Sequence, residues 1–484
     1  MDRSENLTIV KKAGFVSLSR FINLLGLLLT TIMLARYLSK PEFASYDQLW
    51  LIYNTFSPVL SFAFTSSVYF FGTRENAGKY ITAMLLFLTL AGFILTFSLF
   101  LLRFEIAKFL NNPQFYNEFF KFAPFFLFSL PSLILDAILV LKNEFKKLFT
   151  ITNFTVLAYI GVVVLTIILE QGIPFIFAGL SLISLLRFVY TWYLIKKFFN
   201  EKLETIFPYL KEILLYTSPL IVGHISALIS RQVDKYIIAN NFSSDLYATY
   251  TIGAKELPII PLITSSFASV IFPEISKLHG AGKNSEIQRL IKDVVKSTSL
   301  IIIPIFSFLL FFSQEFILIL FSKKYLDSTA IFRIYLFFLP VRILVYSSIL
   351  SAFGRQKIYM LISFLDLVLN LTLGTTLVKA IGLLGPAIAV VVSTYVEALA
   401  MLFFISKALG KVNLLEILPV KFMISTFAFS LFASFLCYLM GSLIENAILR
   451  FILMGGLFST FYLLVAVKLS ILFQNFNCKS TNKK

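Results

Sequence analysis

Twelve charged residues interrupt long apolar stretches of this sequence, and they are its best candidates for chemistry. A charge near the centre of a bilayer costs at least ~2.5 kcal/mol, so it must face a polar cavity or a partner. Seven of the twelve are cationic and five are acidic, which favours non-covalent binding of an anion such as a phosphate or an acidic sugar. The twelve are Arg20, Asp136, Arg187, Arg231, Asp234, Lys235, Lys255, Glu256, Arg333, Arg342, Asp366 and Glu397.

Three of these charges are close together in sequence. Arg231, Asp234 and Lys235 stand at positions i, i+3 and i+4, which share one face of a helix, so Asp234 can pair with either cation. Lys255 and Glu256 follow at moderate depth in the next apolar stretch. Two interpretations stay open for this group: a structural network of ion pairs, or contact with a cargo.

Other polar side chains lie within further apolar stretches. Asp366 and Asn370, four residues apart, form one polar face. Arg20 and Asn23 lie about two helical turns inside the first stretch, where Arg20 could instead extend to the lipid headgroups. We also expect two residues nearer to helix ends to reach the membrane surface; these are Asp136 and Arg333.

These residues divide into two groups of candidates. The candidates for binding a cargo in a cavity are Arg20, Asn23, Arg187, Arg231, Lys235, Lys255, Arg342 and Asn370. The candidates for ion pairs, or for coupling to H⁺ or Na⁺, are Asp234, Glu256, Asp366 and Glu397.

The apolar stretches that carry these charges predict membrane-spanning helices. Hydrophobic residues make up 58% of the 484 residues and charged residues 14%, against roughly half and a quarter in soluble domains. Blocks of roughly 20 apolar residues can cross about 30 Å of hydrocarbon, and lipid requires them to be helical. We expect an all-α polytopic protein with about fourteen spans, at 13–35, 44–71, 78–101, 119–141, 152–170, 174–196, 212–238, 246–272, 293–318, 328–352, 357–379, 382–407, 417–441 and 446–473.

The basic residues between these spans predict an orientation. The loops on one side of the predicted membrane hold 25 Lys or Arg residues in total, and those on the other side hold 8. The side with 25 is expected to be cytoplasmic. This places both termini in the cytoplasm of a multi-pass protein. Dispersed over short loops, the net charge of +17 reflects insertion and anionic lipid rather than nucleic acid, so no nucleic-acid partner is expected.

An internal repeat organises the spans. The segment 35–46 matches 239–250 at Ala, Ser, Ala and Tyr with a shift of 204 residues. A second, weaker similarity between the two halves has a shift of 210 residues. The second shift maps Arg187 onto Glu397, so an ion pair between these two residues is a hypothesis. Because six spans is an even number, the repeats are expected to be parallel, as in transporters that rock one half against the other.

The repeat predicts two six-helix lobes followed by two helices. We expect an N-lobe at 1–196, a cytoplasmic linker at 197–211, a C-lobe at 212–411, and two C-terminal helices with a tail at 412–484.

Two groups of residues resemble a known family. The segment 226–238 with 247–250 resembles the pattern in polysaccharide flippases, where an Asp and a basic residue precede a short loop and a Tyr. The segments 352–357, 370–373 and 381–389 resemble their Gly-basic turn, mid-helix Asn and run of small residues, which lets helices approach closely. Pro386 departs from this run, where another small residue is usual.

These motifs resemble those of the multidrug/oligosaccharidyl-lipid/polysaccharide (MOP) exporter superfamily, and within it the O-antigen or capsule repeat-unit flippases of the Wzx type. The resemblance implies MATE-like lobes in a bacterial inner membrane and alternating access. It implies a cargo of undecaprenyl-diphosphate-linked oligosaccharide, used in O-antigen, lipopolysaccharide, capsule or exopolysaccharide biosynthesis. Glycan polymerase and chain-length proteins are potential partners, and a monomer would suffice.

Other functions stay open. A lipid II flippase would share the spans, although a denser Arg cluster would be expected in its first two helices. A MATE-type multidrug/cation antiporter would favour acidic cavity residues and twelve spans. A membrane glycan polymerase or glycosyltransferase needs larger outer loops and a catalytic constellation, so an enzyme is not expected. Sparse Cys and His residues predict no metal, and no cofactor is expected.

Overall fold

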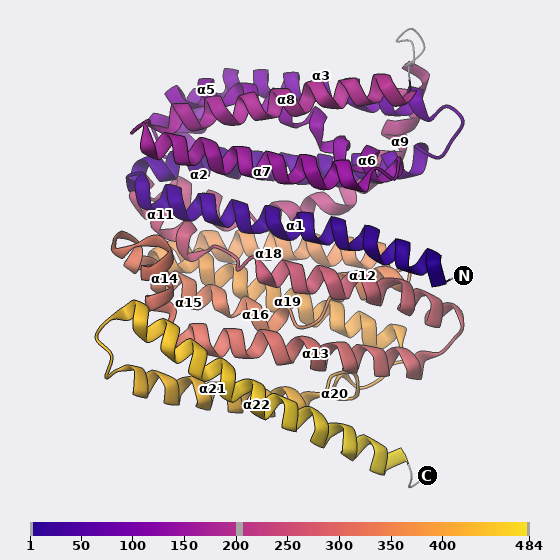
Figure 1. The fold of residues 1–484 in the computed structure, drawn as a ribbon, viewed down its shortest axis with the longest axis vertical. Helices are drawn as coiled ribbons and strands as arrows, with labels where there is room; N and C mark the ends of the chain where they lie inside the picture. The colour runs from indigo at the N-terminus through magenta and orange to yellow at the C-terminus, as the bar shows by residue number, and fades with distance from the viewer. Residues whose placement is uncertain (1–2, 200–206, 482–484) are drawn as a thin grey trace. The chain divides into compact units, whose positions relative to one another are not determined.

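The protein is described by a computed structural model that covers residues 3–199 and 207–481, and these residues form helices without any strand. The chain divides into two compact units, Met1–Thr251 and Ile252–Lys484, and each is described by itself. Figure 1 shows the helices along the chain. The predicted all-α class is confirmed for the described residues.

Long helices and several short ones build the first unit. They are α1 (Arg3–Tyr37), α2 (Lys40–Phe71), α3 (Ala77–Leu101), α4 (Arg103–Phe109), α5 (Gln114–Ser129), η1 (Pro131–Ile134), α6 (Leu135–Leu141), α7 (Phe145–Ile168), α8 (Ile173–Phe199), α9 (Phe207–Ser230), α10 (Val233–Asn241) and α11 (Ser244–Gly253), which crosses the boundary between the units. Within this unit α3, α5 and α8 lie side by side (Figure 1).

The second unit is also built of long helices and several short ones. Its helices are α12 (Ile259–Gly280), α13 (Asn284–Phe311), α14 (Ser313–Phe321), η3 (Lys323–Ser328), α15 (Thr329–Leu336), α16 (Phe338–Val341), α17 (Tyr346–Ala352), α18 (Gln356–Ile381), η4 (Gly382–Leu384), α19 (Gly385–Ala408), α20 (Leu414–Ile417), α21 (Val420–Gly441) and α22 (Ala447–Thr481). A cluster that includes Phe312, Cys437 and Phe458 packs α21 and α22 together (Figure 1).

Ten of the described helical segments are long and apolar enough to cross a membrane, so the chain is a multi-pass membrane protein. One of the ten, Gln356–Ala408, contains both α18 and α19. The count of fourteen spans is not confirmed, because the regions expected at 13–35, 44–71 and 212–238 are not among the ten.

Five expected spans are broken inside the structure rather than continuous, and one of them is the span at 293–318, which is interrupted at Phe312 between α13 and α14. The span at 119–141 is interrupted where η1 begins at Pro131, and the span at 246–272 stops at 254–258, next to Pro258. The span at 328–352 is divided at 342–345, shortly after Pro340, and the span at 212–238 at 231–232. Proline has no backbone N–H and clashes with the preceding turn, which explains the breaks before Pro131 and Pro258. The break at 342–345 lies after Pro340 and is not explained in this way, and α2 continues through Pro58.

The division into units differs from the expected lobe boundary. We expected the second lobe to begin at residue 212, but α9 packs against α2 and α3 and belongs to the first unit. Part of the expected linker, residues 200–206, lies outside the described residues. A packing boundary does not define a moving lobe, so the lobe assignment stays a prediction.

The turn between α18 and α19 depends on two glycines. Gly382 has a φ of +65°, a backbone conformation that side chains with a Cβ rarely adopt. A Cβ at Gly385 would lie 2.4 Å from the backbone carbonyl group of Leu377. The close approach expected for this run is thus present, and Pro386 fits because it lies in the first turn of α19, where its missing N–H has no helical acceptor.

Replacing Gly385 with alanine should destabilise the protein, because the new Cβ would force α18 and α19 apart. Overpacking of this kind costs about 1–3 kcal/mol. We expect a lower temperature of half-unfolding for the purified protein, measured by the loss of its monodisperse peak after heating. Gly161→Ala is the matched control, since a Cβ there meets nothing within 4 Å. Equal unfolding temperatures for G385A and the wild type would contradict this account of the turn.

Candidate functional site

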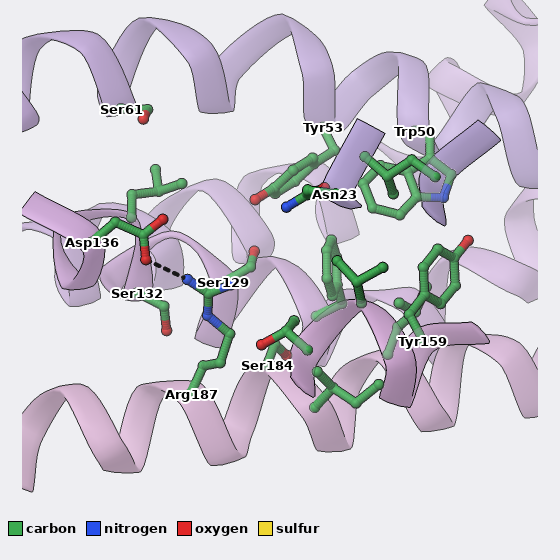
Figure 2. A pocket seen from close by; sticks show the side chains of 17 residues that line it. Asn23, Trp50, Tyr53, Ser61, Ser129, Ser132, Asp136, Tyr159, Ser184 and Arg187 are labelled. Carbon is green, nitrogen blue, oxygen red and sulfur yellow. Dashed lines mark hydrogen bonds and ion pairs between the residues drawn. The ribbon is translucent and has the colours of Figure 1, made fainter. Parts of the chain in front are cut away.

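The first unit encloses a cavity of about 330 Å³, shown in Figure 2. Its walls come from α1, α2, α5, η1, α6, α7 and α8. Among the predicted site residues, Asn23 and Arg187 line it. The cavity therefore brings together polar side chains that are far apart in sequence.

An ion pair forms one end of this cavity. The Nη2 atom of Arg187 lies 3.2 Å from Oδ1 of Asp136 (Figure 2). Asp136 follows the break at Pro131, so its carboxylate faces the cavity instead of reaching the membrane surface as we expected. The Arg187 side chain is 24% exposed and lines the cavity, although its Nε–H is buried and has no hydrogen-bond acceptor among the described residues.

Hydroxyl groups line the cavity beside this ion pair. Ser132 donates to the carbonyl of Phe128 at 2.9 Å, and Ser184 donates to the carbonyl of Ser181 at 2.9 Å. Thr155, from the opposite wall, donates to its own helix in the same way, at 2.8 Å. Because each hydroxyl proton is used within its helix, the oxygen lone pairs remain as acceptors.

Aromatic rings form the other end of the cavity. Trp50 and Phe125 pack edge to face with ring centres 5.4 Å apart, and Tyr53 lies 5.0 Å from Phe125. The hydroxyl of Tyr159 is hydrogen-bonded to that of Tyr46. Figure 2 shows Trp50, Tyr53 and Tyr159 away from the Asp136–Arg187 pair, so one ligand could meet both ends.

The second unit contains an ion pair at two helix breaks. The Nη2 atom of Arg342 lies 3.5 Å from Oε1 of Glu256. Glu256 belongs to the non-helical segment 254–258, and Arg342 begins the segment 342–345. At membrane depth, non-helical backbone is tolerated only where protein groups or a polar cavity satisfy its N–H and C=O groups. We therefore interpret this ion pair as a polar group that accompanies the two helix breaks.

The charges at 231–235 do not share one helical face as expected. The helix breaks at 231–232, and Arg231 is exposed in this turn. Asp234 is 1% exposed; it accepts a hydrogen bond from the Tyr250 hydroxyl at 3.0 Å and lies 3.9 Å from the Lys235 ammonium. The structural interpretation therefore fits Asp234, which is held within the protein.

The remaining predicted residues lie mainly in the second unit. Ser363 donates to Glu397 at 3.1 Å, and Arg333 donates through Nε to Ser313 at 2.7 Å. Asn370 is buried, whereas Asp366 and Lys255 are half-buried. Arg187 and Glu397 thus each have a partner in their own unit, and a pairing between them stays a hypothesis. The side chain of Arg20 lies outside the described residues.

Several polar residues in the membrane were missed by the sequence analysis. Asp47 is 7% exposed and accepts a hydrogen bond from the Tyr247 hydroxyl at 3.1 Å. Glu315 is buried and pairs with Arg450 at 3.0 Å. Each is a charge inside an expected span, so the same search for charges in apolar stretches could have found them.

The fold of this multi-pass membrane protein matches solved structures. The helices match those of lipid II flippase MurJ in an inward closed conformation, with a TM-score of 0.75, 18% identity, and coverage of 96% of this chain and 99% of that chain. The eukaryotic MATE transporter AtDTX14 also matches, with a TM-score of 0.62 and 12% identity over 88% of this chain and 99% of that one. At these identities the likeness establishes the fold alone, which is the MATE-like fold of the MOP superfamily.

Sequence comparison identifies the family. Residues 33–330 match the family model described as "Polysaccharide biosynthesis protein", so the chain belongs to that family. The solved structures that share this fold are named as a flippase and a transporter rather than as glycan-building enzymes, in keeping with the expectation that the chain is not an enzyme.

Two relatives carry related descriptions. The capsular polysaccharide biosynthesis protein CapF of Staphylococcus aureus is 24% identical over 271 residues, 54% of this chain and 68% of that protein. The probable low-salt glycan biosynthesis flippase Agl15 of Haloferax volcanii is 23% identical over 194 residues, 40% of this chain. That match spans only 41% of the length of Agl15.

The ion pair between Glu256 and Arg342 should contribute to stability. We expect Glu256→Gln and Arg342→Gln each to lower the unfolding temperature, and the double variant to lose less than the sum of both. Partly exposed pairs give coupling energies of about 0.2–1 kcal/mol, and a site between membrane helices should be at the upper end.

The exposed pair of Lys283 and Glu286, at 2.9 Å on α13, is the control for this double-mutant cycle. Its coupling should be smaller and should fall further in high salt, because water and ions screen it. A cycle for Glu256 and Arg342 with no coupling would show that their proximity is incidental.

Proposed function

We propose that this protein is a flippase that moves undecaprenyl-diphosphate-linked oligosaccharide repeat units from the inner to the outer leaflet of a bacterial cytoplasmic membrane. The observation that carries the proposal is the match of residues 33–330 to the polysaccharide biosynthesis family. The MurJ-like fold and the polar cavity between membrane helices support it, because a carrier of a sugar head group needs a polar environment within the bilayer.

Alternating access is the proposed mechanism, as is expected for a fold built of two repeated lobes. The head group would occupy polar space within the protein, and the lipid tail would stay in the bilayer. Cations such as Arg187 and Arg342 would contact the head group through hydrogen bonds to oxygen atoms. Coupling to H⁺ or Na⁺ through acidic residues is part of the proposal, as are cytoplasmic termini and glycan polymerase or chain-length partners.

A lipid II flippase is the second candidate, and the fold match to MurJ is the specific observation that favours it. The family match and the description of CapF instead favour a surface polysaccharide. A cation antiporter is less well supported, since the carboxylates of Asp136 and Glu256 are each paired with an arginine.

Complementation of a bacterial strain that lacks its O-antigen repeat-unit flippase tests the proposal. We expect the wild-type chain to restore surface glycan, measured by glycan staining of whole-cell extracts. Arg187→Ala and Arg342→Ala should reduce the restored glycan at least tenfold at equal membrane levels, because each removes a polar contact for the cargo.

Arg289→Ala is the matched control, since Arg289 is exposed on the first part of α13 and does not line the cavity. It should restore as much glycan as the wild type. If the chain fails in this strain but supports growth after depletion of the lipid II flippase, the second candidate replaces the first.

A further inference from the structure

The cavity of the first unit has no net charge. Arg187 and Asp136 are its only ionisable groups of opposite sign and they pair at 3.2 Å, while its other described polar lining residues are neutral. A carboxylate or phosphate entering this space would meet Asp136 and would lose its own hydration. The cavity therefore suits a neutral ligand, unlike the anionic cargo expected from the excess of cations in the sequence.

The Asp136–Arg187 pair also makes the cavity a poor cation site. A guanidinium within hydrogen-bond distance already neutralises the carboxylate, and an added Na⁺ would be repelled by Arg187. The described residues contain no group of three or more His, Cys, Asp or Glu side chains that could hold a metal ion.

The polar groups of the cavity match those of a sugar. The part of the Arg187 guanidinium that lines the cavity offers N–H donors, and Asp136 offers acceptors, as do the hydroxyl oxygens of Ser132, Thr155 and Ser184. Each hydroxyl group of a sugar is both a donor and an acceptor, so it can use both kinds of partner. Bonds to the charged pair are the stronger ones and would orient the ring.

The aromatic end completes this match. Trp50 and Tyr53 present rigid aromatic surface away from the ion pair (Figure 2), and Phe125 packs against both rings. The C–H face of a pyranose ring is apolar, while its hydroxyl groups point outward, so a ring can pack on the aromatic groups and hydrogen-bond at the other end. A volume of about 330 Å³ lies at the small end of the ~300–1,000 Å³ range for ligand sites, which is enough for one sugar ring.

We propose that this cavity binds one neutral sugar residue of the cargo, with the pyranose ring packed on Trp50 and Tyr53 and its hydroxyl groups bound to Asp136 and Arg187. The identity of the ligand as part of a lipid-linked glycan rests on the proposed function. The diphosphate then occupies a different part of the protein, because this cavity lacks the net positive charge that a diphosphate requires.

Tryptophan fluorescence can report directly on this site. The chain has two tryptophans, Trp50 in the cavity wall and Trp192 in the helical core, so Trp192→Phe leaves Trp50 as the only reporter. The full chain is placed in lipid nanodiscs, so that no sugar-headed detergent competes. The probes are methyl glycosides of glucose, galactose and N-acetylglucosamine, with methyl glucuronide as the charged analogue.

We expect at least one neutral glycoside to change the Trp50 emission saturably. Methyl glucuronide should bind at least tenfold more weakly, and Arg187→Ala should weaken the neutral glycoside at least tenfold. Arg289→Ala, the control on α13, should bind as the unsubstituted reporter does. Should Trp192→Phe not fold, the wild-type protein serves, because Trp192 packs against the core cluster and does not line the cavity.

Two outcomes would overturn the proposal. One is the lack of a saturable change with every neutral glycoside, or a change that Arg187→Ala leaves intact. The other is an emission that responds to Na⁺ or pH but not to sugars, which would make the cavity an ion-coupling site.

The complementation assay separates this inference from the proposed function. Restored surface glycan without glycoside binding would contradict only the proposed sugar subsite. If the chain binds a glycoside but restores neither surface glycan nor growth after depletion of the lipid II flippase, only the proposed flippase function is contradicted.

Discussion

The structure depends on one constraint: polar groups placed among apolar helices must find partners inside the protein, because lipid provides none. The constraint is most visible where helices break, since a break exposes backbone groups that a continuous helix would satisfy. After the break at Pro131, Asp136 pairs with Arg187, and the breaks at 254–258 and 342–345 hold Glu256 and Arg342. These two ion pairs therefore accompany irregular backbone.

Both units contain a broken helix at a corresponding place in the sequence. The shift of 210 residues takes Pro131 to Val341, the last residue of α16. One break is followed by Asp136 and the other by Arg342, so the two sites carry opposite charges. Each unit supplies the missing charge from another segment, Arg187 in the first and Glu256 in the second. In each unit a helix break is thus accompanied by an ion pair, and the two ion pairs are made by different residues.

Much of the fold follows from hydropathy, whereas the site does not. Continuous apolar blocks such as 78–101 and 420–441 become helices because lipid permits little else, and Pro131 and Pro258 mark two of the breaks. Asp136 was assigned to the membrane surface because its depth was counted along an unbroken helix. The aromatic wall could not be predicted, since 56 phenylalanines and 21 tyrosines make any aromatic residue uninformative by type. Only the tertiary structure distinguishes Tyr53, which lines the cavity, from rings that face lipid.

Charge neutrality at the ion pairs constrains what the sites can recognise. In each pair the arginine Nε–H is buried without an acceptor among the described residues, while the terminal nitrogen binds a carboxylate. The guanidinium is thus oriented by its partner and has more N–H groups than the carboxylate uses, and the carboxylate lowers the cost of keeping the cation between apolar helices. A lone arginine would attract any anion that reached it. An arginine already paired gains little from a second anion but still hydrogen-bonds a neutral hydroxyl group. Selection for sugars over free anions in such a site therefore follows from the pairing itself.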